Sequence, residues 1–386
     1  MLHGETTTRS TLDPDTLIAR LQARGVAQLR AEPAIWVLLD GSDLRKPHAQ
    51  AMEHLQRVKR LSGEGTVPGY RTLNALGVGR QRRGLLYHRL FSSTAPGFKS
   101  ESDEVQRALT SIGAALTPLG ADVTYIMDSG FDDIAVAGAI WQQGHHAVWR
   151  VQHPDRLVRP APDQPLCHLA DLAPRLRPVA EVATELVVQR RGQPRPKLQR
   201  VTAQIASVPL VVDWQEDVRT QPDGTWHRQP LWLVEVRLAD VAQAPWWLLT
   251  DRPVETAEQA VEIFTMYRQR WAVADAFKVG KTCLGWEDVQ VLAYDAVRVL
   301  VALGWVAAGF LYELGVTLEW AEVRLLRRLG GGEDRPHRPV GKSVLMRGLR
   351  RLLDHLVTET ILADEVRQHG QLPPRIAALL RRPITG

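Results

Sequence analysis

The stretch at residues 122–144, DVTYIMDSGFDDIAVAGAIWQQG, contains the unit from which the fold of this chain is built. It opens with an apolar, β-branched run that is typical of a buried strand and ends at Asp128. The following residues predict a turn and a helix, and HAVWRVQ at 146–152 predicts another strand. A strand, a helix and a second strand in this order favour an α/β fold.

The residues before this stretch extend the same pattern. Asp13 before Pro14 is a helix start signal, and the apolar run IWVLL reads as a buried strand that ends at Asp40. The turn-prone GRQRRG separates two more strand-like runs. The predicted segments are a helix over 13–32, strands at 35–39, 72–78 and 85–92, and a helix at about 103–117. Together they indicate an α/β core with a mixed sheet.

The composition changes after residue 155. Residues 156–250 are rich in Pro and Arg at first and then alternate between apolar and polar residues, which predicts a β-rich insertion. The core then resumes with a helix from about 257, because Thr256-x-x-Gln259 forms a capping box. The tail after about 320 reads as basic and helical, with a glycine-rich break at 330–332.

Composition limits the classes of protein to consider. A chain of 386 residues with 45% hydrophobic residues predicts two or three domains with sizeable cores. The most apolar helix, Val297–Leu314, is broken by Arg298, Gly304 and Gly309, so no membrane span is expected. The first residues lack the apolar segment of a signal peptide, and two cysteines give no disulfide framework. We therefore expect a cytoplasmic protein.

Arginines are clustered although the net charge is only +5. Neutralisation of phosphates by Lys and Arg drives nucleic-acid binding, so the clusters favour a nucleic-acid partner. The alternative is a coding bias that replaces Lys with Arg on ordinary solvated surfaces. The clusters are GRQRRG at 79–84, QRRGQPRPKLQR at 189–200 and LLRRLGGGEDRPHRPVGK at 325–342.

The stretch YRQRWAVADAFKVGKTCL, at 267–284, predicts one helix with a polar face. At about 100° per residue, five of its side chains fall within an arc of roughly 80°. Four of them carry a positive charge or donate hydrogen bonds, a combination suited to binding a polyanion. The alternative is an exposed cationic stripe on an amphipathic helix. The five residues are Tyr267, Arg270, Ala274, Lys278 and Lys281.

The spacing of these residues resembles the Tyr-x2-Arg-x3-Glu-x6-Lys signature of bacterial insertion-sequence DDE transposases, the cut-and-paste, hairpin-forming group. Tyr267, Arg270 and Lys281 match the signature, whereas Ala274 occupies the position of the Glu. The resemblance covers most of residues 34–352, including the tail motif RPVGKSVLMRGLRRL at 338–352. It implies a ribonuclease-H-like core interrupted by a β-rich insertion and followed by a basic helical C-terminal region.

The resemblance also assigns an active site. Asp40 in DGSDLRKP and Asp128 in DSGFDD match the first two acids of the family, which hold two Mg²⁺ ions, or Mn²⁺ in their place, with a Glu at position 274. Two such ions can activate a water or a 3′-hydroxyl and stabilise the leaving oxygen of a phosphodiester. Without the resemblance, an Asp after a strand is more often a turn or cap residue.

Further residues are assigned to DNA by the resemblance. Tyr267, Arg270, Lys278 and Lys281 contact transposon-end phosphates, which positions the DNA without reading its sequence. Trp246 stands where relatives place a tryptophan that stacks on a flipped base. Its neighbour Trp247 leaves that assignment ambiguous, and the alternative is that either indole fills a core.

Ala274 decides what is expected of catalysis. Asp275 projects about 100° away on a helix and is a poor substitute. The alanine is either an engineered replacement or a natural loss, and in both cases we expect a chain that binds DNA and metal but cuts DNA poorly. The rival to an impaired transposase is a catalytically dead DNA-binding regulator or inhibitor of transposition. A metal-dependent nuclease unrelated to transposition is a third reading.

The chain is expected to have five parts. Its expected partner is double-stranded DNA, both the transposon ends and the target. A homodimer on DNA is implied by the family because both ends are cut together. Residues 1–33 are too few for a three-helix DNA reader, so end recognition falls to the insertion and the tail, or the N-terminus is truncated. The parts are a helical segment (1–33), the first part of the core (34–155), the β-rich insertion (156–250), the second part of the core (251–320) and the basic helical region (321–386).

Overall fold

Strands β1 (Ala34–Arg45) and β5 (Asp122–Met127) pair in parallel, and this pair carries both predicted acids. On its other side β1 pairs antiparallel with β3 (Thr66–Val78), so the sheet is mixed and the fold is α/β, as predicted. The computed structural model describes residues 12–61, 63–188, 197–215, 225–239, 244–332, 340–374 and 376–377.

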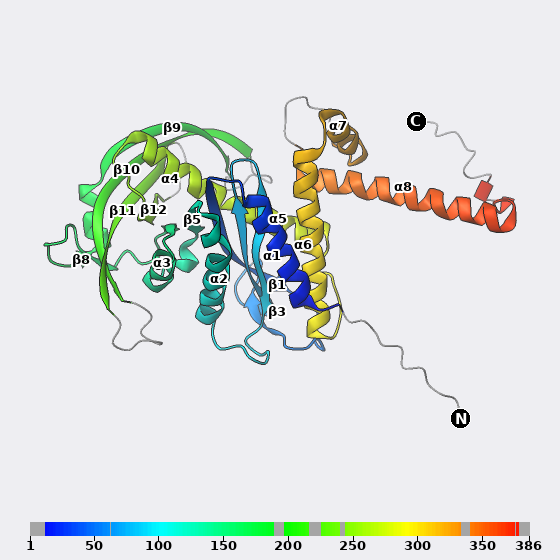
Figure 1. Ribbon diagram of the computed structural model, residues 1–386, viewed down its shortest axis with the longest axis horizontal. Helices are drawn as coiled ribbons and strands as arrows, with labels where there is room; N and C mark the ends of the chain where they lie inside the picture. The colour runs from blue at the N-terminus through cyan, green and yellow to red at the C-terminus, as the bar shows by residue number, and fades with distance from the viewer. Residues whose placement is uncertain are drawn as a thin grey trace. The chain divides into compact units, whose positions relative to one another are not determined.

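Within these residues ten strands form one sheet in the order β2-β3-β1-β5-β6-β12-β11-β10-β9, with β4 also paired to β3. Figure 1 shows this curved sheet with helices against it. Strands β9 to β12 lie in the stretch predicted as an insertion, and they extend the core sheet because β12 pairs with β6. The remaining strands are β2 (Gln56–Lys59), β4 (Arg83–Phe91), β6 (His146–Arg150), β9 (Arg177–Val188), β10 (Lys197–Gln215), β11 (Trp226–Leu238) and β12 (Trp246–Thr250), and the short β7 (Leu157–Val158) and β8 (Cys167–His168) pair separately.

The described residues form two compact units. The first contains the described residues up to Lys278 together with Trp286–Val306, and the second contains Val279–Gly285 and the described residues from Ala307 onward. Helices of the first unit are α1 (Pro14–Leu29), α2 (Glu101–Leu116), α3 (Ile134–Trp141), α4 (Ala257–Gln269) and α5 (Trp271–Lys278), with the 3₁₀ helices η1 (Thr117–Leu119), η2 (Ser129–Phe131) and η3 (Leu169–Arg175).

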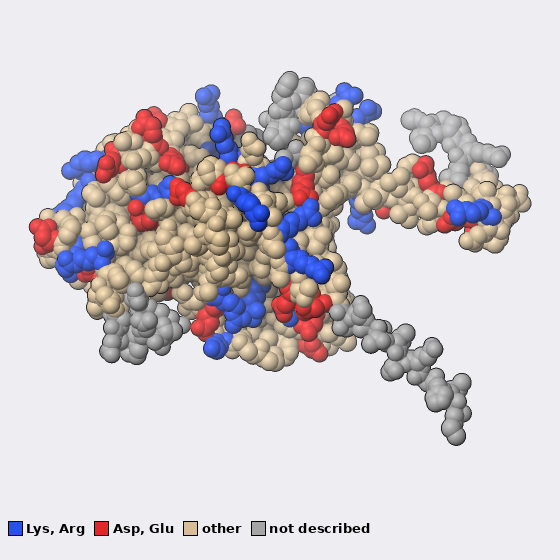
Figure 2. Space-filling model, viewed as in Figure 1, with Lys and Arg blue, Asp and Glu red and all other residues tan. Residues whose placement is uncertain are grey.

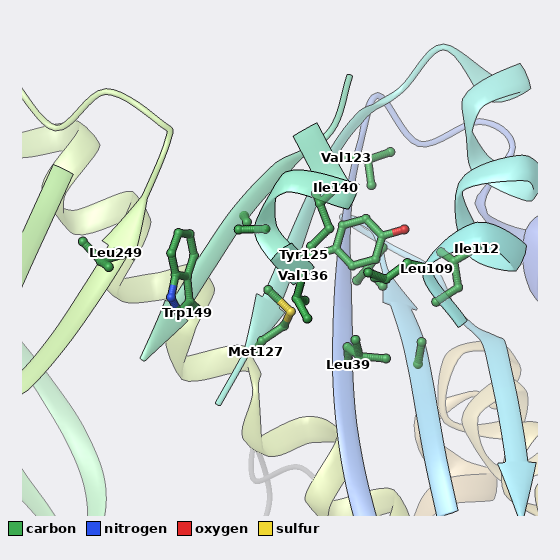
Figure 3. Packing of buried hydrophobic residues seen from close by; sticks show 14 of the residues in the cluster. Leu39, Leu109, Ile112, Val123, Tyr125, Met127, Val136, Ile140, Trp149 and Leu249 are labelled. Carbon is green, nitrogen blue, oxygen red and sulfur yellow. The ribbon is translucent and has the colours of Figure 1, made fainter. Parts of the chain in front are cut away.

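One face of the sheet carries the main hydrophobic core. Alternate residues of β1, ending with Leu39, pack with Tyr125 and Met127 of β5 against α2 and α3. Figure 3 shows Leu109 and Ile112 of α2 beside these strand residues. The alternation turns Asp40 to the opposite face, where α5 packs on β1. The core therefore determines which way the acid points.

Two helix starts were predicted correctly. Asp13 is the N-cap of α1, and its carboxylate accepts from the backbone N–H of Thr16 at 2.9 Å. Thr256 and Gln259 form the predicted capping box at the start of α4. A side-chain oxygen at the N-cap satisfies a backbone donor that the first helical turn leaves unpaired, which is why these short motifs are informative.

Two predictions about segment ends were wrong. Strand β1 does not end at Asp40 but continues to Arg45, because its antiparallel ladder with β3 runs on after the pairing with β5 stops at Leu39. The expected single helix over 267–284 is interrupted at Arg270, and after α5 it becomes a π-helical turn, η4 (Val279–Cys283). The helical segment ends before Gly285, which has a left-handed φ of 65°.

The second unit is helical, as the tail was predicted to be. Helices α7 (Trp320–Leu329) and α8 (Lys342–His369) pack where Gly348 lies so close that a Cβ there would be 2.0 Å from the carbonyl oxygen of Leu326. Arg347 and Arg351 of α8 donate to the carbonyls of Gly330 and Leu329, at 3.1 and 2.7 Å, and so cap the end of α7.

Helix α6 (Tyr294–Thr317) runs from the first unit into the second. Among the described helices, it alone is long and apolar enough to cross a membrane by length and composition, with mean hydropathy 1.6 over its best stretch. A helix that packs in a core passes the same test, and Val297, Val301 and Trp305 are buried here. This is weak support for a membrane span.

Candidate functional site

The parallel register brings the two predicted acids together. Leu39 is paired with Met127, so Asp40 and Asp128 are the next residues on neighbouring strands. Asp40 stays in the β1–β3 ladder opposite Asn74, whereas Asp128 leaves its strand and caps η2. One carboxylate oxygen of Asp128 accepts from the backbone N–H of Gly130 at 2.8 Å. The other carboxylate oxygen, Oδ2, lies near Arg270, as Oδ2 of Asp40 does.

Arg270 lies against both acids. Its Nη1 is 3.7 Å from Oδ2 of Asp40 and 3.8 Å from Oδ2 of Asp128. The side chains of Arg270, Asp40 and Asp128 are 19%, 13% and 35% exposed, so water only partly screens the attraction between their charges. The Nε of Arg270 is buried without a hydrogen-bond partner. One cationic group is thus held between two carboxylates that come from different strands.

Arg270 stands at the junction of α4 and α5. Its backbone N–H donates to the carbonyl of Tyr267 at 3.1 Å, and its guanidinium lies 6.0 Å from the centre of that ring. Tyr267 itself is 4% exposed. Burial raises the pKa of Tyr267, and the nearby Arg270 opposes that rise. Tyr267 therefore supports Arg270 from the core rather than presenting its ring to solvent.

Ala274 is exposed on α5, four residues after Arg270, which is the C-cap of α4. Asp275 is exposed as well, on a different side of the helix. Lys278 is the exposed last residue of α5. Lys281 lies in η4, in the second unit, so its position is defined only within that unit. The structure brings together Asp40, Asp128 and Arg270, and Ala274 follows on the next helix, α5.

The two tryptophans of β12 are both engaged in the fold. Trp246 is 2% exposed and packs against Phe264, Tyr267 and Trp271, with ring centres 6.3, 5.7 and 5.8 Å away. Trp247 is partly buried, and its indole N–H donates to Glu235 at 3.1 Å. Trp246 is therefore a packing residue in this structure, which is the alternative that the sequence left open for it.

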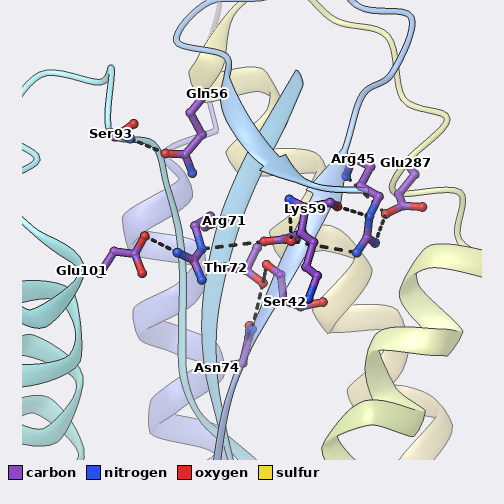
Figure 4. A network of polar contacts seen from close by, with 11 residues as sticks. Ser42, Arg45, Gln56, Lys59, Arg71, Thr72, Asn74, Ser93, Glu101 and Glu287 are labelled. Atoms are coloured by element: carbon purple, nitrogen blue, oxygen red, sulfur yellow. Dashed lines mark hydrogen bonds and ion pairs between the residues drawn. The ribbon is translucent and has the colours of Figure 1, made fainter. Parts of the chain in front are cut away.

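A cavity of about 520 Å³ includes both acids in its wall. The sequence did not point to its other charged residues. Arg71 contacts Glu101 and lies 3.7 Å from Asp43, while Arg45 contacts Glu287 and donates to the carbonyl of Lys59 at 2.8 Å (Figure 4). Charged residues close to the first acid in DGSDLR, here Asp43 and Arg45, were the available signal. The further charged lining residues are Asp43, Arg45, Arg71, Glu101 and Asp133.

Surface charge is mixed on the face drawn in Figure 2, where Lys and Arg are interspersed with Asp and Glu. Of the predicted basic clusters, GRQRRG forms the turn between β3 and β4. There the Glu32 carboxylate accepts from the backbone N–H groups of Arg80, Gln81 and Arg82 at 2.8–3.1 Å. Much of the other two clusters, residues 189–196 and 333–339, lies outside the described residues.

The acid pair fits a divalent cation by its donor set and by the position of Arg270. Mg²⁺ usually takes one or two protein carboxylates and completes its shell with water and phosphate oxygens. The positively charged Nη1 of Arg270 lies within 4 Å of both carboxylates, where a cation would also be attracted. Within the described part of the chain, no group of three or more His, Cys, Asp and Glu side chains is arranged to hold a metal. Two carboxylates are therefore the donors this site offers.

Comparison with known proteins finds no family model that matches the chain and no curated protein that matches it significantly.

Proposed function

We propose that this chain is a DNA-binding protein of the DDE-transposase type, with its active site at Asp40 and Asp128 and with cleavage impaired by Ala274. The observation that carries the proposal is the pair of acids on neighbouring parallel strands, both in contact with Arg270, which lies between α4 and the helix α5 that carries residue 274.

The topology supports a ribonuclease-H-like core within the larger sheet. Strands β1, β3 and β4 form an antiparallel meander, and β5 and β6 then run parallel to β1 across helical connections. This is the arrangement expected of such a core. Strands β9 to β12 are inserted between β6 and α4 and extend the sheet on the β6 side.

The chemistry would rest on a few residues. Asp40 and Asp128 would hold Mg²⁺, or Mn²⁺, through the oxygens that now face Arg270. The bound ion would supply Lewis acidity for the cleavage and transfer of phosphodiesters. Lys278 is exposed beyond Ala274 and would contact a DNA phosphate. Because position 274 offers no carboxylate, one ligand is missing and cleavage, hairpin formation and strand transfer are expected to be slow.

The proposed partners are transposon-end and target DNA and a second copy of the chain. Helix α8 supports the second copy, because apolar residues from its middle to its C-terminal end are exposed within the described structure of its unit. Large exposed apolar patches are typical of protein interfaces. We assign the protein to the cytoplasm as part of this proposal. The exposed residues are Leu353, Leu356, Val357, Ile361 and Val366.

The test compares cleavage by the chain with that by its Ala274→Glu and Ala274→Gln variants. The substrate is labelled duplex DNA carrying the ends, with flanks, of the element that encodes the chain, in Mg²⁺. We expect cleavage by Ala274→Glu alone, since Gln matches Glu in shape but lacks the charge that a metal ligand needs. Ordinary cleavage by the unaltered chain would contradict the impairment.

The rival function is a catalytically dead regulator that occupies transposon ends. It is favoured if all three proteins bind end DNA and none cuts it. A nuclease unrelated to transposition would cut duplexes of unrelated sequence as readily as end DNA. Binding and cleavage assays with end DNA and with DNA of unrelated sequence therefore distinguish the two rival functions.

A further inference from the structure

We infer that Arg270 is an exchangeable internal counter-ion of the acid pair, so that a divalent cation binds tightly only when a phosphate draws the guanidinium away. This inference rests on the proposed function, because it concerns metal and DNA at the same site. It adds a regulatory property to the site, namely that its affinity for metal depends on nucleic acid.

The geometry shows a guanidinium near both acids but bonded tightly to neither. Hydrogen bonds from N–H to carboxylate oxygens are typically about 2.7–2.9 Å long when both groups are charged. Nη1 of Arg270 is 3.7 Å from Asp40 and 3.8 Å from Asp128. Attraction at these distances is electrostatic and lacks the directional bond that would fix the side chain. A contact of this kind is readily exchanged.

The position of Arg270 also leaves a donor unused. Its Nε is buried with no hydrogen-bond partner, which is unfavourable for a polar group. A phosphate accepts two parallel hydrogen bonds from a guanidinium, so movement toward a phosphate would satisfy donors that the acids leave unpaired. The base of the side chain would stay in place, because the neighbouring Tyr267 is buried.

A nearby positive charge stabilises the two acids in their ionised form. Like charges that share a site disfavour each other, and the carboxylates of Asp40 and Asp128 are 13% and 35% exposed. In the absence of DNA, Arg270 contributes positive charge to the pair and competes with a divalent cation for the same space. With a phosphate present, Arg270 gains a new partner and its competition with the cation is relieved. Metal binding and phosphate binding are then positively coupled through one side chain.

The matched control is Arg268, two residues earlier. Its guanidinium contacts Thr184 and donates to the carbonyl of Glu185 at 2.9 Å, away from the acid pair. Replacement of Arg268 by Ala removes the same charge and a similar side chain from the same helix. Any effect that is specific to Arg270→Ala therefore comes from the acids.

The experiment is titration of Mn²⁺ into the full chain by calorimetry, with and without short duplex DNA. We expect Arg270→Ala to bind Mn²⁺ at least about tenfold more tightly than the unaltered chain without DNA. Arg268→Ala should match the unaltered chain. Duplex DNA should strengthen Mn²⁺ binding to the unaltered chain and change it little in Arg270→Ala. Asp128→Asn should abolish the Mn²⁺ signal.

Two results would overturn the inference in different ways. If Arg270→Ala binds Mn²⁺ no more tightly than the unaltered chain, while Asp128→Asn removes binding, Arg270 is no counter-ion but the metal site of the proposed function stands. If neither the unaltered chain nor the Arg270→Ala and Ala274→Glu variants bind Mn²⁺ with DNA present, the proposed function fails along with the inference. Circular dichroism of each variant verifies the fold.

Discussion

Nη1 of Arg270 lies 3.7 Å from Oδ2 of Asp40, although the two residues come from opposite ends of the first unit's sequence. The contact exists because β1 turns Asp40 away from the main core and because α4 ends at Arg270 on that face of the sheet. Asp128 joins them through the parallel register. The predicted acids thus sit in a site that is already partly neutralised.

Replacement of Asp128 by Asn should stabilise the fold by about 0.5–1 kcal/mol, because it removes repulsion between two carboxylates that share one guanidinium. Asn can still accept from the backbone N–H of Gly130, so the turn is kept. Urea unfolding in EDTA measures the change. Asp133→Asn is the control, since Asp133 caps α3 and Asn caps equally well. A loss of stability in Asp128→Asn would contradict the argument.

Replacement of Trp246 by Ala should lower the free energy of unfolding by about 3–5 kcal/mol, because the indole is buried among three aromatic rings. Replacement of Trp226, which is 68% exposed, by Ala should hardly change the free energy of unfolding. Denaturant titration followed by circular dichroism compares the two variants. Equal stabilities would show that Trp246 is free to leave the core, as a base-stacking residue must be.

Lys46 should be needed for stability. The side chain is buried, and its Nζ donates to the carbonyls of Trp286, Glu287 and Val289 at 2.7, 3.0 and 2.6 Å. Lys46→Met leaves these acceptors without their donor and should cost about 2–4 kcal/mol in thermal or urea unfolding. The exposed Lys59 serves as the control, and Lys59→Met should be close to neutral.

Lys46 should also affect how stability varies with pH. Burial lowers the pKa of Lys46 to about 8, against the opposing effect of Asp288 and Glu287. An unfolded chain has a lysine pKa of about 10.4 and so binds more protons between these values, which makes stability rise with pH. The stability of the unaltered chain relative to Lys46→Met should therefore increase from pH 8 to pH 10. If the difference in free energy of unfolding between the two proteins does not change from pH 8 to pH 10, the prediction is refuted.

His88 should make the fold sensitive to acid. Burial lowers the pKa of His88 to about 3, and its Nδ1 accepts from the indole N–H of Trp305 at 2.9 Å. The unfolded chain, with a histidine pKa of about 6.5, binds more protons below neutrality, so stability falls as pH drops from 6.5 toward 3. His88→Gln should show a smaller fall in unfolding experiments, whereas His355→Gln, at an exposed position of α8, should behave like the unaltered chain.

Gly25 should not tolerate alanine. A Cβ at this position of α1 would lie 2.1 Å from the carbonyl oxygen of Leu85 in β4, where the backbone cannot easily move. Gly25→Ala should destabilise the fold by about 1–3 kcal/mol. Gly309 in α6 has nothing within 4 Å of such a Cβ, and Gly309→Ala should stabilise by about 0.5–1 kcal/mol. Thermal unfolding of the two variants tests whether Gly25→Ala is less stable and Gly309→Ala more stable than the unaltered chain. A stabilised Gly25→Ala would overturn the packing argument.

Local motifs were predictable because their physics is local. The caps at Asp13 and Thr256 follow from the bonding needs of a few neighbouring residues. The interruption at Arg270 and the π-helical turn were not visible in the pattern, since both alter hydrogen bonds without altering which residues are apolar. Sequence periodicity records the face of a helix and not its continuity.

The sequence by itself determined the α/β class and the approximate strands and helices, because apolar periodicity and turn residues act over short distances. Asp40 and Asp128 became site candidates through the resemblance of their local motifs to those of a known family. Only the tertiary structure decided that β1 runs past Asp40, that Trp246 is buried, and that Arg270 lies between the two acids. These depend on which strands pair and on which face α4 and α5 pack. Such choices are made by contacts between residues far apart in the chain, and no short stretch of sequence records them.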